Sequence, residues 1–98
     1  MCLLNTQAVE QVVFGPDGIT HAHAVRWLVD HSSVPPEQTR DWSQRLFAAC
    51  KADWLDAPVS GGVAGVQVGT LAVMVGGSCR ALESASQALQ AYASNITH

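Results

Sequence analysis

Basic residues are scarce in this sequence. Its 98 residues include five lysines and arginines in total, against eight aspartates and glutamates, and the formal net charge is −3. Because proteins bind a phosphate backbone through clustered Lys and Arg side chains, this composition argues against nucleic acid as a partner. Long apolar runs are also lacking, since none approaches the roughly 20 residues that a helix needs to span a bilayer. No membrane partner is therefore expected.

Cysteine is rare as well, and Cys2, Cys50 and Cys79 are odd in number and far apart. This pattern fits reduced thiols better than a disulfide framework or a zinc site. His21 and His23 are separated by one residue and lack further ligands nearby, so we interpret them as part of a polar connection and expect no metal. No targeting segment is visible at the amino terminus. We expect a cytoplasmic or mitochondrial-matrix location.

The rest of the sequence alternates between strand-like and helix-like patterns. Short apolar runs bounded by turn residues predict buried strands at 25–30, 54–58 and 71–75. Amphipathic runs predict helices at 7–14, 36–50 and 79–93. A strand, a helix and a second strand within about 35 residues form one right-handed βαβ unit. The predicted fold class is therefore α/β, with a mostly parallel sheet.

Helix caps and one helix face can be predicted in more detail. Thr6 and Ser78 precede the first and last helices and are residue types that cap helix N-termini. The first helix is expected to bury an apolar face formed by Ala8, Val9, Val12 and Val13.

Both ends of the sequence resemble interrupted strands. Met1 to Asn5 has the character of the last turn of a buried strand, and Ile96 to His98 has that of a strand just beginning. A complete domain seldom starts and stops inside its core elements. We therefore interpret the chain as part of a larger protein.

The most distinctive stretch runs from Asp56 to Gly77 and reads DAPVSGGVAGVQVGTLAVMVGG, a glycine-rich connection between two apolar runs. Its four glycines within residues 61–69 allow the backbone to approach a small anion with several amide N–H groups, and the Ser60 hydroxyl stands beside them. The same glycines are equally compatible with a tight connection that binds nothing. The residues alone leave an anion cradle and a simple turn as alternatives.

Polar residues follow the predicted strand ends. Ligands of open parallel sheets bind in the crevice outside the carboxyl ends of the strands. We therefore expect one crevice to collect Asn5, Ser32, Ser33 and Ser60.

Several familiar catalytic motifs do not occur in the sequence. A hydrolase nucleophile elbow has glycine two residues before its serine, and Ser60 lacks that glycine. Neither a P-loop nor a G-x-G-x-x-G fingerprint is present. We interpret His31, beside Asp30, as an exposed loop histidine rather than half of a catalytic pair. We interpret Asp56 as a structural hydrogen-bond acceptor rather than an acid or base. The tryptophans are assigned to the core; they are Trp27, Trp42 and Trp54.

Three stretches resemble, in order, segments of one known family. They are Leu3 to Asn5 with Val9 to Gly18, then Leu28 to Glu37 with the pattern D-x-S-[ST]-x-x-P, then Asp56 to Gly77. The family is that of 3-hydroxyisobutyrate dehydrogenase, the β-hydroxyacid dehydrogenases related to 6-phosphogluconate dehydrogenase. The resemblance covers nearly the whole chain.

The resemblance implies a fold and a function. In that family a Rossmann domain binds NAD or NADP, an all-helical domain closes over it, and short 3-hydroxy acids are oxidised to aldehyde acids or formed from them. Residues 1–98 would be a partial Rossmann-type domain, its second half, with three layers and a later antiparallel strand. The full-length parent would be a homo-oligomer with a small hydroxy acid as substrate.

The resemblance also assigns residues. It implies that Ser60, Gly61 and Gly62 bind the substrate carboxylate. It implies that the cofactor, NAD or NADP, is contacted by Leu3, Leu4 and Ser33. Leu4 stands where the family usually has proline, so the local turn is expected to differ.

Two parts of the family's machinery have no counterpart in this sequence. The resemblance implies a glycine fingerprint upstream of Met1 and a catalytic lysine, in a G-x-x-K-x-x-N helix, downstream of His98. The single lysine, Lys51, is placed on the side away from the crevice. Hydride transfer needs a bound nicotinamide and a proton-transfer group within about 3 Å of the hydroxyl, so the chain alone is expected to be inactive, with no catalytic residue of its own.

The predicted function is thus the substrate-carboxylate loop and part of the cofactor wall of an NAD(P)-dependent oxidoreductase. Two alternatives stay open. One is a non-catalytic binding or oligomerisation module with the same fold, and the other is a gene product that does not accumulate.

Overall fold

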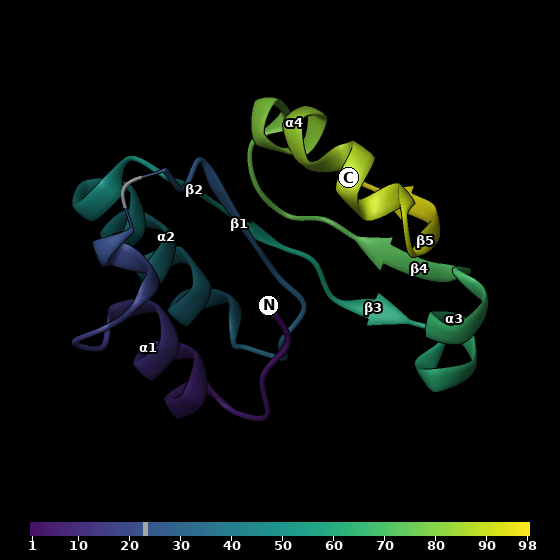
Figure 1. Ribbon diagram of the computed structural model, residues 1–98, viewed down its shortest axis with the longest axis horizontal. Helices are drawn as coiled ribbons and strands as arrows, with labels where there is room; N and C mark the ends of the chain where they lie inside the picture. The colour runs from purple at the N-terminus through teal and green to yellow at the C-terminus, as the bar shows by residue number, and fades with distance from the viewer. Residues whose placement is uncertain (23) are drawn as a thin grey trace.

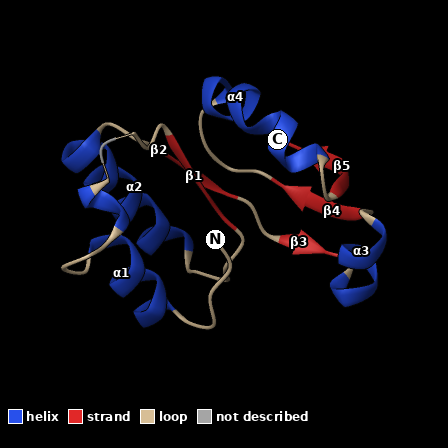
Figure 2. Ribbon diagram, viewed as in Figure 1, coloured by secondary structure: helices blue, strands red, loops and turns tan. Residues whose placement is uncertain are grey.

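The computed structural model describes residues 1–22 and 24–98, and the connection predicted at His23 lies outside them. The helices of the described residues are α1 (Thr6–Phe14), η1 (Ile19–His21), α2 (Pro36–Cys50), α3 (Gly62–Val68) and α4 (Cys79–Gln90). The strands are β1 (Trp27–Asp30), β2 (Asp53–Asp56), β3 (Val59–Ser60), β4 (Leu71–Met74) and β5 (Ala93–Thr97). Figures 1 and 2 show their arrangement.

The strands of the described residues form two small sheets, which a bridge between single residues connects. β1 and β2 are parallel, with Asp30 opposite Asp56. β4 pairs with antiparallel β3 on one side and with parallel β5 on the other. An antiparallel bridge between Asp56, at the end of β2, and Gly76, after β4, joins the two sheets, and the chain then continues from β2 into β3 (Figure 2). The predicted α/β class, with a mostly parallel sheet and a later antiparallel strand, is confirmed.

Helices cover both faces of this sheet. In Figure 1, α1 and α2 lie on one side of β1 and β2, and α4 lies on the other. Along β1, Leu28 packs in the cluster with α1 and α2, whereas Val29 packs in the cluster with α4. In β2, Trp54 packs in the cluster with α1 and α2, and Leu55 packs in the cluster with α4. This alternation follows from the two-residue period of a strand and produces three layers.

The amino-terminal segment lies beside β1, as its strand-like composition predicts, although it forms no regular strand. The terminal ammonium of Met1 donates to the Val29 carbonyl at 2.7 Å, and the His31 N–H donates to the Met1 carbonyl at 2.7 Å. At the other end of the chain, Ile96 and Thr97 belong to β5. They complete a strand that began at Ala93 rather than starting one.

Helix α1 begins one residue earlier than predicted. Its N-cap is Asn5, whose Oδ1 accepts from the Ala8 N–H at 2.8 Å, so the prediction of Thr6 as cap was wrong. Asparagine and threonine both cap helices, and the Asn5 side chain satisfies one of the N–H groups of the first turn that have no acceptor within the helix. The buried face of α1 is also narrower than predicted, because Val12 is 41% exposed while Val9 is fully buried.

Helix α4 begins as predicted and ends early. The Ser78 hydroxyl accepts from the Ala81 N–H at 3.1 Å, which confirms Ser78 as the N-cap. The helix stops at Gln90, since Ala93 already pairs with Leu71 in the sheet. Tyr92, which falls within the helix predicted at 79–93, therefore lies in the connection to β5.

The glycine-rich connection contains a short helix, which the sequence reading missed. Glycine is a poor helix former, so the pattern favoured a loop. Gly62–Val68 nevertheless folds as α3, packed against the start of β4. A Cβ at Gly65 would lie 2.9 Å from Cδ2 of Leu71, so a larger residue there would have to displace the Leu71 side chain. Tertiary packing overrides the local preference here.

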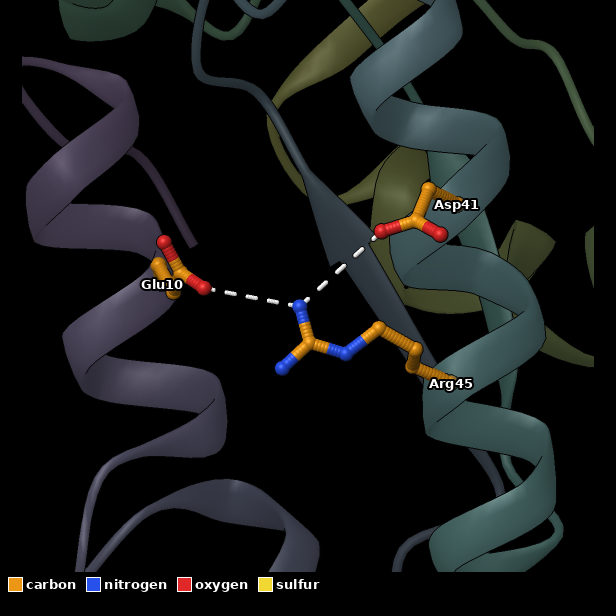
Figure 3. A network of polar contacts seen from close by, with 3 residues as sticks. All are labelled: Glu10, Asp41 and Arg45. Carbon is orange, nitrogen blue, oxygen red and sulfur yellow. Dashed lines mark hydrogen bonds and ion pairs between the residues drawn. The ribbon is translucent and has the colours of Figure 1, made fainter.

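Surface charges add little to the contact between α1 and α2. Figure 3 shows Arg45 of α2 between Glu10 of α1 and Asp41 of its own helix, with Nη1–O distances of 3.4 and 3.9 Å. All three side chains are partly exposed, and such ion pairs contribute about 0–1 kcal/mol. The buried contacts of Trp42 hold α1 and α2 together instead.

The helices are also short. Among the described residues, none is long and apolar enough to cross a membrane.

Candidate functional site

A crevice lies at the carboxyl ends of β1 and β2, which are neighbours because the two strands are parallel. It has a volume of about 410 Å³ and is lined by Ser32, Ser33, Val34, Pro35, Asp56 and Pro58. The crevice predicted at this edge therefore exists, but it contains two of the four expected polar residues. Asn5 caps α1 instead, and Ser60 lies further along the chain in β3.

Ser32 and Asp30 stabilise the floor of this crevice. Ser32 is 3% exposed; its hydroxyl accepts from the Leu3 N–H at 2.7 Å, and its own N–H donates to Oδ1 of Asp30 at 2.9 Å. Asp30 is fully buried, and its Oδ2 has no hydrogen-bond partner within the described part of the chain. These bonds tie the amino-terminal segment to the end of β1.

The three residues assigned to the cofactor lie at this same edge. The Leu4 side chain is 95% exposed, and Ser33 is exposed where it lines the crevice. Leu3 is half-buried, and its backbone is held by Ser32.

The Ser60–Gly62 segment, assigned to the substrate carboxylate, follows the same strand path as Pro58. Ser60 pairs with Ala72 and is exposed. Gly61 has a φ of 128° and Gly62 a φ of 57°, and a Cβ at Gly61 would lie 3.2 Å from Leu71 Cδ2. Glycine is therefore favoured at Gly61 by its backbone conformation, and an added Cβ would also press on the Leu71 side chain. The segment leads into α3, whose first N–H groups have no acceptor within the helix.

Asp56 is the titratable group of the crevice. Burial raises the pKa of its carboxyl group, and the nearby charge of Asp30 raises it further. The hydrogen bonds of Asp56 among the described residues are those of its backbone with Gly76, at 2.9 and 2.7 Å. The predicted role of its side chain as a structural acceptor therefore does not hold.

Replacing Asp56 by asparagine should change how stability depends on pH. Because the folded-state pKa is raised above the unfolded value of 3.8, the folded form binds the proton more tightly. Its contribution to stability is full below pH 3.8 and is lost as pH rises through the folded pKa. Asp56→Asn should remove this loss. The check is the urea-unfolding free energy at several pH values, with Asp53→Asn of the same strand as control; equal pH slopes in the wild type and Asp56→Asn would contradict the assignment.

His31 was misread from the sequence. It is half-buried rather than exposed, and both ring nitrogens have partners: Nδ1 lies 2.6 Å from the Ala57 carbonyl oxygen and Nε2 lies 2.6 Å from the Tyr92 hydroxyl. The His31 and Tyr92 rings meet edge to face, with centroids 5.5 Å apart. Tyr92 is 61 residues away in sequence, so no local pattern could have indicated the contact.

Lys51 lies just before β2, at the opposite end of that strand from the crevice. It ends α2 in the left-handed conformation, with a φ of 61°, and stands just before β2 rather than after it. The prediction that Lys51 lies on the side away from the crevice is confirmed.

Open three-layer α/β sheets bind their ligands in the crevice outside the carboxyl ends of the strands, and the crevice of this chain lies there. The whole chain, residues 1–98, matches the family described as the NAD binding domain of 6-phosphogluconate dehydrogenase. The chain belongs to this family. The family resemblance read from the sequence is confirmed, as is NAD or NADP as the expected cofactor class.

Individual relatives agree with this assignment. The chain is 38% identical to 2-hydroxy-3-oxopropionate reductase of Escherichia coli, over 95% of the chain and 32% of the relative. It is 39% identical to 3-hydroxyisobutyrate dehydrogenase of Pseudomonas aeruginosa, over 94% of the chain and 31% of the relative. The chain thus spans about a third of the length of these relatives.

Solved structures give the same result. A crystal structure of 3-hydroxyisobutyrate dehydrogenase from Salmonella typhimurium matches 99% of the chain and 33% of its own, at 31% identity and a TM-score of 0.89. Psf3 in complex with NADP+ and 2-OPP matches 98% of the chain and 34% of its own, at 30% identity and a TM-score of 0.87. These matches identify the observed layers as those of a Rossmann-type dehydrogenase domain.

Proposed function

We propose that this chain is the substrate- and cofactor-facing part of an NAD(P)-dependent dehydrogenase that converts the alcohol of a short 3-hydroxy acid to a carbonyl. One observation carries the proposal. Ser33, which follows β1, and Pro58, which precedes the Ser60–Gly62 segment, line the same crevice. A cofactor at Ser33 and a carboxylate at Ser60–Gly62 would therefore share one edge of the sheet. Membership of an NAD-binding family supports the redox chemistry.

The residue roles in this proposal follow from what each group offers. Ser60, Gly61 and Gly62 bind the substrate carboxylate through the serine hydroxyl and backbone N–H groups, since a carboxylate accepts hydrogen bonds only. Ser33, Leu3 and Leu4 contact the cofactor, which, when bound, supplies the hydride acceptor. Residues 1–98 then form part of the NAD(P)-binding domain of a homo-oligomeric parent.

The proposal assigns no proton-transfer residue to this chain. Lys51 precedes β2, at the opposite end of the strand from the crevice. General acid–base catalysis requires a group within hydrogen-bond reach of the substrate hydroxyl. The chain alone should therefore form no NADH from NAD+ and a 3-hydroxy acid.

Binding can be tested on the chain itself. We expect 3-hydroxypropionate to shift the amide NMR signals of Gly61 and Gly62, because the carboxylate accepts their N–H groups. Ser60→Ala should weaken this binding by about 3- to 10-fold, as loss of one hydrogen bond does. Ser94→Ala, at an exposed serine of β5, is the matched control and should bind like the wild type. Signals of Gly61 and Gly62 that do not respond to 3-hydroxypropionate would contradict the assignment.

A second candidate is an oligomerisation module with the same fold. Its support is the exposed apolar surface of α3 and β4, where Val63 is 75% exposed, Val66 58%, Val68 71% and Met74 60%. Apolar side chains grouped in this way mark interaction surfaces. Sedimentation of the chain separates the two candidates. A stable oligomer that Val66→Ser dissociates, together with no response to 3-hydroxypropionate, would favour the module.

A further inference from the structure

The His31 side chain links three segments at the carboxyl edge of the sheet. It follows β1, it contacts the Ala57 carbonyl after β2, and it contacts the Tyr92 hydroxyl before β5. A carbonyl oxygen only accepts, so Nδ1 carries a proton and donates to Ala57. In the neutral ring, Nε2 then accepts from the Tyr92 O–H, and the partners fix both tautomer and ring orientation.

Both partners of His31 are linked to the Ser60–Gly62 segment through intervening residues: Ala57 along the chain, and Tyr92 through Leu71. Ala57 is fully buried, its N–H donates to the Asp30 carbonyl at 2.8 Å, and the chain continues through Pro58 into β3. The chain before the segment is therefore held at Ala57 by two hydrogen bonds, one with the His31 ring and one with the Asp30 carbonyl.

Tyr92 is linked to the segment through Leu71. Its carbonyl accepts from the Leu71 N–H at 3.4 Å, and the Leu71 side chain is what a Cβ at Gly61 would touch, at 3.2 Å. The hydroxyl of Tyr92 is a dependable donor, because burial raises its pKa and keeps it protonated. His31 thus connects the chain that enters the Ser60–Gly62 segment with the strand on which the segment packs.

We propose that His31 is a positioning residue that holds the Ser60–Gly62 segment in its binding conformation through Ala57 and Tyr92. The inference rests on the proposed function, since it takes this segment as the carboxylate site. Gly61 and Gly62 are the least restrained residue type, and a flexible binding segment loses entropy when it binds. Holding both the chain before the segment, at Ala57, and the strand on which it packs reduces that loss of entropy. His31 acts on the segment and not on the substrate, because both of its ring nitrogens already have partners.

The first test uses the unaltered chain. Imidazole ¹⁵N NMR distinguishes the two neutral tautomers of each histidine. We expect His31 to carry its proton on Nδ1, with Nε2 as the acceptor. A neutral His31 with its proton on Nε2 would overturn the inference, because that ring cannot donate to Ala57.

The second test removes the tether in steps. Tyr92→Phe keeps the ring and removes the hydroxyl, His31→Asn keeps a donor near the Nδ1 position, and His31→Ala removes both contacts. His21→Asn, at an exposed histidine of η1, is the matched control. We expect amide hydrogen exchange at Gly65, whose N–H donates to the Gly61 carbonyl at 3.0 Å, to be faster by about 3- to 10-fold in Tyr92→Phe and faster still in His31→Ala, with His31→Asn between wild type and His31→Ala. Exchange in α2 should stay unchanged, which a general loss of stability would not allow.

Binding of 3-hydroxypropionate separates this inference from the proposed function. We expect the same variants to weaken it in the same order, and His21→Asn to leave it unchanged. If the wild type does not bind 3-hydroxypropionate, the proposed function fails, and the tautomer and exchange results still decide the positioning role. If the Gly65 amide exchanges in Tyr92→Phe and His31→Ala as it does in the wild type, the inference is overturned.

Discussion

Replacing Trp42 by alanine is expected to lower the free energy of unfolding by about 3–5 kcal/mol. Trp42 is 1% exposed, and its ring centroid lies 6.4 Å from that of Phe14 and 5.8 Å from that of Trp54. It therefore fills the space where α1, α2 and the sheet meet. A close-packed interior relaxes only partly around a deleted side chain, so alanine would leave a cavity.

Urea unfolding followed by circular dichroism measures this loss, and helix α2 provides its own control. Phe47 is on the same helix but is 48% exposed, so Phe47→Ala should cost about 1 kcal/mol or less. Trp42→Phe should cost less than Trp42→Ala, because it retains an aromatic ring and removes an indole N–H that has no partner among the described residues. Equal losses in Trp42→Ala and Phe47→Ala would contradict the placement of the core.

Gly77→Ala is expected to lower the free energy of unfolding by about 2–4 kcal/mol, from backbone strain and from overpacking together. Gly77 has a φ of 137°, which side-chain-bearing residues rarely adopt. A Cβ there would lie 2.7 Å from Cδ2 of Leu55 and 3.0 Å from the Trp54 carbonyl oxygen. The backbone oxygen cannot move aside as a side chain can, so the turn between β4 and α4 would have to shift.

The adjacent glycine is the matched control for this substitution. At Gly76 the nearest atoms to an added Cβ are 3.8 and 3.9 Å away, and its φ is not positive. Gly76→Ala should therefore change the unfolding free energy by less than about 1 kcal/mol. Thermal unfolding of the two variants side by side gives the comparison. If Gly77→Ala unfolds at the same temperature as Gly76→Ala, the assigned backbone strain is absent.

The elements that sequence patterns predicted are those with strong local signals. Pro36 stands in the first turn of α2 and Ser78 caps α4, and both helices begin where these residues indicate. The apolar runs at β1, β2 and β4 also predicted strands, although the pattern placed the end of β2 at Pro58. That strand ends at Asp56 because the chain bends at Ala57 and Pro58 before it continues as β3.

The parts that were missed depend on contacts distant in sequence. Helix α3 forms in a glycine-rich stretch because Gly65 packs within contact distance of the Leu71 side chain. The pairing of His31 with Tyr92 joins residues 61 positions apart. Neither contact leaves a periodic pattern that a window of neighbouring residues could reveal.

In the candidate site too, some features could be predicted from sequence motifs and others depend on tertiary contacts. Motif similarity was enough to identify the family, because the stretch from Asp56 to Gly77 combines residue types and spacings that few folds share. It was not enough to say how the polar residues would be distributed. Asn5 is used as a helix cap, Ser32 is buried beneath the crevice, and Ser33 remains open to it.

The sequence by itself determined the family, the α/β class and the order of most elements, because these depend on local composition, periodicity and motif spacing. The tertiary structure decided which side chains face the crevice, that the glycine-rich segment contains a helix, and that His31 is held between Ala57 and Tyr92. These features depend on which surfaces meet when the sheet and helices pack, and that is set by close contact and hydrogen bonding between distant parts of the chain.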